Sequence, residues 1–96
     1  MLSKTEIENK LQEIKPLLAE QFNVSSIGYF GSYSEGDPTN KSDLDLLVEF
    51  SKPIGWKFFT LEKFLEQTFD LPVDLVTKNG LKEQFKETVL RKVIYI

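Results

Sequence analysis

The chain has 96 residues with 12 basic and 15 acidic side chains, and it contains no cysteine and no histidine. These counts exclude disulfides, thiolate zinc sites and histidine acid–base chemistry, so any catalysis or metal binding must use carboxylates, lysines, tyrosines or hydroxyls. The net charge of −3 argues against broad nucleic-acid binding, and no 18-residue apolar run or signal-peptide pattern is present. We therefore expect one cytoplasmic domain over residues 1–96.

The first predicted element is an amphipathic helix over residues 4–22. Ser3 and Glu6 form a Ser-x-x-Glu capping box at its start. Apolar residues then recur at helical spacing, at Ile7, Leu11, Ile14, Leu18 and Phe22. We expect Asn23 to end this helix and a short strand to follow over Ser26–Phe30.

A glycine–serine pair, Gly31 and Ser32, stands directly after that strand, and a helical turn is expected next. Glycine has no Cβ, so it lets the backbone approach phosphate, while exposed amides and a serine hydroxyl donate hydrogen bonds to the anion. The pair fits a phosphate-binding turn, but by itself it is more typical of a plain turn that binds nothing. A loop over residues 36–40 comes next.

The strand predicted over Asp43–Phe50 has the clearest alternation in the chain. Its buried face would carry Leu44, Leu46, Val48 and Phe50. Asp43 and Asp45 would project from the other face, with Cα atoms about 6.5–7 Å apart. Both carboxylates can therefore reach a single cation between them.

The second half is predicted to form a helix over residues 56–69, a strand over Val73–Thr77, and a third helix from Leu81 to about Lys92. Residues 93–96 form an apolar tail that would add an edge strand. The third helix would turn three side chains inward, those of Leu81, Phe85 and Val89. This element order predicts an α+β fold, with a small mixed sheet of three to four strands and helices packed against it.

Trp56 and Phe59 fall nearly opposite the apolar stripe of the 56–69 helix. If the helix begins at or before Trp56, both aromatic rings face solvent or a partner. If it begins later, Trp56 packs in a turn. An exposed pair would be a candidate docking patch, because aromatic residues are enriched at interface hot spots.

A third aspartate, Asp74, lies in the Val73–Thr77 strand. If that strand runs beside Asp43–Phe50, the three carboxylates share one patch. Two unit charges ~4 Å apart repel by ~4 kcal/mol at an effective dielectric of about 20. Either the three aspartates lie apart and are solvated, or a divalent cation such as magnesium neutralises them.

These residues together resemble the minimal nucleotidyltransferase (MNT) family of the DNA polymerase beta-type nucleotidyltransferase superfamily. The resemblance rests on Gly31-Ser32, ten intervening residues, Asp43-x-Asp45 in an apolar strand, and Asp74 within Val-Asp-Leu-Val. It spans nearly the whole chain and implies the nucleotidyltransferase fold, with an α-β-α-β-α-β core.

The resemblance also implies roles for these residues. Gly31 and Ser32 would hold the triphosphate of ATP, the co-substrate. Asp43, Asp45 and Asp74 would bind two Mg²⁺ ions, and Asp74 would help to deprotonate the attacking hydroxyl. The chemistry would be two-metal nucleotidyl transfer, in which pyrophosphate leaves in line.

One position departs from the family pattern. Many members carry an arginine where this chain has Glu35, and a glutamate there would repel phosphate rather than bind it. We expect Lys41 to compensate for the nucleotide affinity that the missing arginine would have provided.

Stand-alone MNT proteins are commonly encoded beside a HEPN-domain ribonuclease toxin. The resemblance implies that this chain transfers AMP from ATP to a tyrosine of such a toxin and acts as its antitoxin, as a homo- or hetero-oligomer. Two other functions stay open. One is a non-enzymatic antitoxin that neutralises by binding, which Glu35 favours. The other is a nucleotidyltransferase acting on a small-molecule or RNA hydroxyl.

Overall fold

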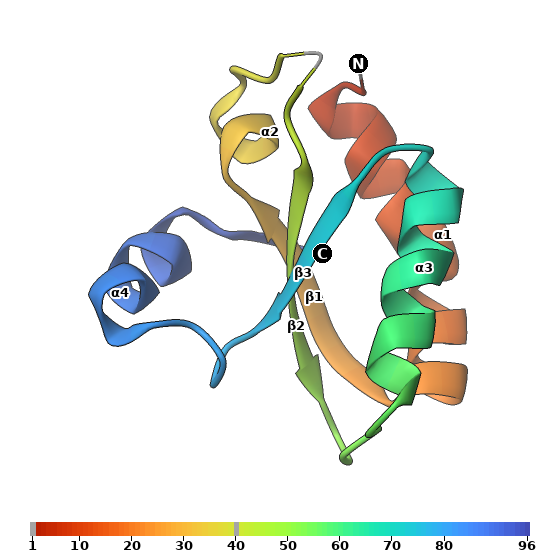
Figure 1. Ribbon diagram of the computed structural model, residues 1–96. Coiled ribbons are helices and arrows are strands. Elements are labelled where there is room, and N and C mark those ends of the chain that lie inside the picture. Colours follow the sequence, from red (N-terminus) through yellow and green to blue (C-terminus); the bar gives the residue numbers. More distant parts are fainter. Residues whose placement is uncertain (1, 40) are drawn as a thin grey trace.

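The computed structural model describes residues 2–39 and 41–96. Within these ranges, four helices and four strands alternate along the chain (Figure 1). They are α1 (Lys4–Phe22), β1 (Val24–Phe30), α2 (Ser32–Glu35), β2 (Leu44–Phe50), α3 (Lys57–Phe69), β3 (Val73–Thr77), α4 (Glu83–Lys92) and β4 (Ile94–Tyr95).

The four strands form one mixed sheet in the order β3-β2-β1-β4. β1 pairs antiparallel with both β2 and β4, whereas β2 pairs parallel with β3. The predicted α+β class is therefore confirmed, and the apolar tail does add an edge strand. Strand β1 begins at Val24, two residues earlier than the sequence pattern predicted.

The ends of α1 follow the local signals in the sequence. The Ser3 hydroxyl accepts a hydrogen bond from the Glu6 amide, and the Glu6 carboxylate accepts one from the Ser3 amide, each at 3.1 Å. At the other end, Asn23 adopts a left-handed conformation with φ 55°, which stops the helix and starts β1.

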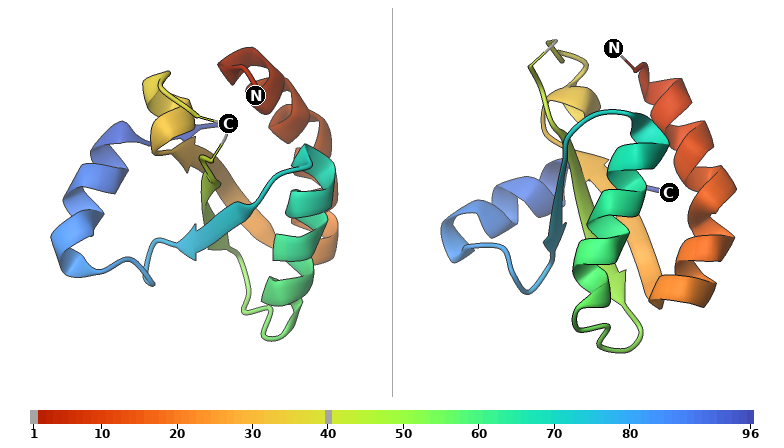
Figure 2. Two further views of the ribbon diagram at one scale, coloured as in Figure 1. Left: turned by 45° about the horizontal axis from the view of Figure 1, so that its top comes forward. Right: turned by 45° about the vertical axis from the view of Figure 1, so that its right-hand side comes forward.

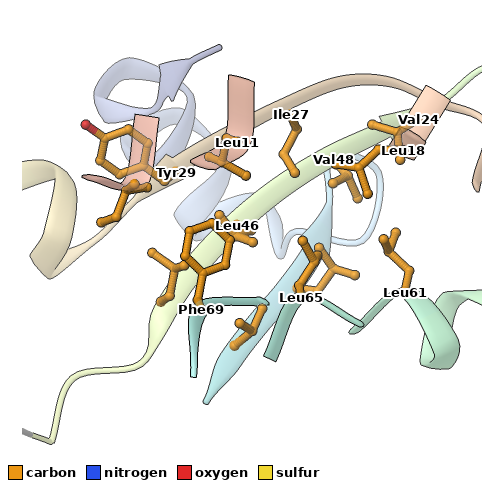
Figure 3. Close-up of a cluster of buried hydrophobic side chains, with 14 of the residues drawn as sticks. Leu11, Leu18, Val24, Ile27, Tyr29, Leu46, Val48, Leu61, Leu65 and Phe69 are labelled. Atoms are coloured by element: carbon orange, nitrogen blue, oxygen red, sulfur yellow. The ribbon is translucent and has the colours of Figure 1, made fainter. Parts of the chain in front are cut away.

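The hydrophobic core lies between the sheet and the layer formed by α1 and α3 (Figures 1 and 3). Leu44, Leu46 and Val48 of β2 all point into this core and are fully buried, as the alternation predicts. Tyr29 of β1 is buried with them, and its hydroxyl donates a hydrogen bond to the Glu8 carboxylate of α1. Burial and this carboxylate raise the pKa of Tyr29 above its ordinary value.

Helix α4 lies on the opposite side of the sheet from α1 and α3 (Figures 1 and 2). The prediction that it turns Phe85 inward is wrong, because Phe85 is 53% exposed. Val89 is half-buried, and no residue of α4 is fully buried. Leu81, the third residue of that predicted face, precedes the helix and is only half-buried. The helical pattern marks an apolar stripe correctly, but it does not say how closely that stripe meets the sheet.

Helix α3 begins at Lys57, and Trp56 is its N-cap residue. Trp56 is 85% exposed and Phe59 is 57% exposed, and their ring centroids lie 5.9 Å apart. Both rings therefore face outward, as the first alternative predicted, although the helix begins after Trp56, as the second assumed. Within the described part of the chain, no helix combines the length and apolar composition that a bilayer crossing needs.

Candidate active site

The acidic residues gather on the sheet face that points away from α1 and α3. Leu44 and Leu46 are fully buried on the core side, so Asp45 between them projects to the other face. In the parallel pairing of β2 with β3, Asp45 is the direct partner of Asp74. Side chains at paired positions lie on the same face with Cβ atoms about 4.5–5.5 Å apart. The structure thus brings Asp45 and Asp74 together from strands that are 29 residues apart in sequence.

Asp43 joins these two carboxylates from the residue before β2. The pKa of Asp45 is raised to about 6, first by burial, then by the charges of Asp74 and Asp43, and finally by a hydrogen bond with Asp74. Asp43 and Asp74 are exposed, whereas Asp45 is half-buried. The three predicted site aspartates therefore form one acidic patch centred on Asp45.

Gly31 lies directly against this patch. Its backbone has φ 73° and ψ −150°, a conformation essentially restricted to glycine. A Cβ at residue 31 would overlap the Asp45 Oδ2 atom and lie 3.2 Å from Asp45 Cγ. The glycine is therefore required both by its backbone angles and by the Asp45 carboxylate.

Helix α2 continues from Gly31 as a single turn that begins at Ser32. The Gly31 carbonyl accepts hydrogen bonds from the amides of Ser34 and Glu35, both at 3.1 Å, and from the Ser34 hydroxyl at 2.9 Å. Ser32 is half-exposed. The structure thus places the Gly31-Ser32 turn next to Asp45, which the sequence could not show.

The residues present fit a divalent cation by charge and donor type. Carboxylate oxygens are the ligands that Mg²⁺ prefers, and the pKa of Asp45 is raised by burial and then by the negative charges of Asp74 and Asp43. Among residues 2–39 and 41–96, no three acidic side chains already surround a common point. Because Asp43 and Asp74 are exposed, their side chains are free to rotate toward a bound ion.

Glu35 is engaged in an ion pair that the sequence analysis missed. Its Oε1 atom accepts a hydrogen bond from Lys92 Nζ, at the end of α4, at 2.8 Å. The cation that pairs with Glu35 is therefore Lys92. That Lys41 compensates at the phosphates stays a prediction. The two partners are 57 residues apart, so no spacing rule could have paired them.

The fold and the acidic face together define the class of protein. The chain belongs to the nucleotidyltransferase domain family, which matches residues 11–96. Among individual proteins, the protein adenylyltransferase MntA of Thermococcus cleftensis is 46% identical over 97 residues, covering 100% of this chain and 98% of the relative.

Solved structures show the same fold. The structure of a minimal nucleotidyltransferase has a TM-score of 0.81 at 29% identity, covering 97% of this chain and 95% of that one. A toxin–antitoxin structure with AMP-PNP has a TM-score of 0.73 at 28% identity, covering 92% and 70%. A chain of the toxin–antitoxin MntA–HepT shares the fold with a TM-score of 0.65 at 20% identity, covering 92% and 69%. The resemblance to minimal nucleotidyltransferases is thereby confirmed.

Proposed function

We propose that this chain is a protein adenylyltransferase that transfers AMP from ATP to a tyrosine hydroxyl of a HEPN-type ribonuclease toxin and thereby acts as its antitoxin. The observation that carries the proposal is the pairing of Asp45 with Asp74 against Gly31. Two likenesses support it. The adenylyltransferase MntA is similar over its whole length, and a toxin–antitoxin structure of the same fold contains an ATP analogue.

Different residues of the site would bind the phosphates and activate the acceptor hydroxyl. Gly31 and Ser32 would bind the triphosphate, because the turn brings backbone and hydroxyl donors up to the acidic face without a side chain at residue 31. The acceptor oxygen would attack the α-phosphorus, the bond to the bridging oxygen would break, and pyrophosphate would leave. Asp74, which is exposed, would accept the proton of the acceptor hydroxyl.

Asp43, Asp45 and Asp74 would also hold two Mg²⁺ ions, which supply activation of the acceptor oxygen and screening of the triphosphate charge when bound. The acidic patch suits this role because burial, and then the charges of Asp74 and Asp43, raise the pKa of Asp45, so that a bound cation would relieve the repulsion among the carboxylates.

The test is the mass of the toxin. The purified protein is incubated with a HEPN-type toxin, ATP and Mg²⁺, and the intact mass of the toxin is measured together with its ribonuclease activity. We expect the toxin to gain the mass of one or more AMP units at a tyrosine and to lose ribonuclease activity. The Asp43→Ala/Asp45→Ala variant should leave the toxin unmodified.

Two results would contradict the proposal. Loss of ribonuclease activity with unchanged toxin mass would indicate an antitoxin that acts by binding alone. AMP transfer to an RNA end or a small hydroxyl compound, with the toxin unmodified, would indicate a different acceptor.

A further inference from the structure

Lys92 ends α4 and reaches across to the turn that follows Gly31. Its ammonium donates to the Glu35 carboxylate at 2.8 Å, and the two side chains are 51% and 49% exposed. Among the ion pairs of the described residues, this is the one that connects a cation to the segment from Gly31 to Asp45. Lys92, from the last helix, thus brings a positive charge to this segment.

We propose that Lys92 binds the phosphates of the nucleotide and that Glu35 presents its ammonium to them. This inference rests on the proposed function, because it takes ATP as the ligand. It assigns the C-terminal end of α4 to the nucleotide site, although the sequence motif lies entirely elsewhere.

Helix α2 brings Glu35, the partner of Lys92, next to Ser32 of the phosphate turn. Ser32 and Glu35 are three residues apart in the same helical turn, so their Cβ atoms are neighbours about 5–6 Å apart. An ammonium has three donors, and Glu35 uses one of them. The other donors of the half-exposed Lys92 are available to an anion bound at Ser32.

The charges around the site favour such a group. Asp43, Asp45 and Asp74 are all acidic, and Glu35 adds a fourth negative charge on α2. A triphosphate that enters this field meets repulsion unless cations offset it. Lys92 offsets Glu35 in the free protein and can contact the phosphates once they arrive.

The sheet fixes where Lys92 sits. Two residues further on, Ile94 pairs with Tyr29, and Tyr95 pairs with Gly28 in β1. A Cβ at Gly28 would lie 2.7 Å from the Ile94 carbonyl oxygen and 2.9 Å from Val93 Cγ2. The glycine therefore lets the backbone after Lys92 close onto β1, which anchors the lysine beside α2 although α4 itself buries no residue.

The experiment measures the affinity of the full chain for two probes, ATP and inorganic tripolyphosphate, by calorimetry in the presence of Mg²⁺. The variants are Lys92→Gln, Lys92→Arg, Glu35→Gln and Glu35→Gln/Lys92→Gln. Arg91→Gln is the matched control, because it removes the same charge from the adjacent residue, whose guanidinium pairs with Glu87 instead. The ion pair is half-exposed, so we expect all variants to unfold at nearly the same temperature.

We expect Lys92→Gln to weaken the binding of both probes about tenfold in the wild-type background. In the Glu35→Gln background the effect should be smaller but still present, because the lysine is no longer held by the carboxylate. Lys92→Arg should restore most of the affinity, and Arg91→Gln should change it less than about twofold. A Lys92→Gln effect that disappears in the Glu35→Gln background would show that the lysine only neutralises Glu35, and would overturn the proposal. Unchanged affinity in Lys92→Gln would overturn it as well. If the wild type binds neither probe, the proposed function itself fails.

Discussion

The carboxylate of Asp45 occupies the space that a side chain at residue 31 would need. Strand β1 leads into Gly31, and β2 carries Asp45 opposite Phe30, the last residue of β1. The antiparallel pairing of these two strands therefore places the glycine turn against the acidic patch. One contact thus joins the two halves of the motif, the turn proposed for phosphate and the carboxylates proposed for metal.

This contact makes Gly31→Ala costly. The new side chain adopts an unfavourable φ and overlaps the Asp45 carboxylate, so we expect a loss of about 1–3 kcal/mol from the backbone conformation, with the overlap adding to it. Urea denaturation measures the change. The double variant Gly31→Ala/Asp45→Ala should regain part of the stability, since only the overlap is relieved. A single variant as stable as the wild type would show that the turn is not held as described.

Magnesium should stabilise the protein through the acidic patch. We expect Mg²⁺ to raise the melting temperature of the free protein or of its ATP complex by about 5 °C at tenfold excess over Kd. Asp43→Ala/Asp45→Ala should lose this response, because it removes two of the three carboxylates. Asp37→Ala is the control, since it removes one exposed carboxylate from the neighbouring loop. A wild type that does not respond at all would argue against a metal site.

The raised pKa of Asp45 predicts a pH dependence of stability. Its native pKa is about 6 against an ordinary value of 3.8. Between these pH values the native state holds a proton that the unfolded chain has released, so the free energy of unfolding falls as pH rises through this window. At pH 7.5 in the absence of metal, the penalty is on the order of 1 kcal/mol, after discounting for the partial exposure of the carboxyl group.

Asp45→Asn isolates this effect from the other carboxylates. We expect the variant to be more stable than the wild type at pH 7.5, with the gap closing near pH 4.5, while its AMP transfer is lost. Chemical denaturation at both pH values measures the difference. If the difference in unfolding free energy between Asp45→Asn and the wild type does not change with pH, the raised pKa of Asp45 is not its cause.

The exposed aromatic pair is predicted to contact the toxin. Trp56 and Phe59 are large, outward-facing and in contact with each other. Aromatic residues of this kind are enriched among those that contribute most to binding energy at protein interfaces. We expect Trp56→Ala/Phe59→Ala to weaken the complex with the toxin at least about tenfold. Its stability should change by less than about 0.5 kcal/mol. Phe85→Ala, which removes an exposed ring from α4, is the control. If the wild type, the double variant and Phe85→Ala bind the toxin with equal affinity, the Trp56–Phe59 surface does not contact the toxin.

Local patterns predict most of this fold, and the reasons are visible in particular residues. The capping box at Ser3 and the left-handed Asn23 are short-range effects, so α1 is bounded as expected. The alternation along β2 likewise places Leu44, Leu46 and Val48 on the core face and Asp45 on the other, although Leu47 on the Asp45 face is buried as well.

What the sequence does not contain is the order and register of the strands. Nothing local states that β3 runs parallel beside β2, or that Asp74 stands opposite Asp45 rather than one residue away. The Glu35–Lys92 contact is missed for the same reason, since it depends on how β4 closes onto β1. The exposure of α4 could not be predicted either, because an apolar stripe shows which side of a helix faces the sheet but not how closely the helix packs against it.

The sparse packing of α4 has a consequence for how the molecule opens. A helix without buried side chains has few contacts to lose on detachment, so amide hydrogens of residues 83–92 should exchange long before those of the core strands. Each such local opening would separate Lys92 from Glu35 and move the lysine away from the nucleotide-binding turn, while the rest of the domain stays folded. Slowed exchange in this one helix would then report nucleotide occupancy.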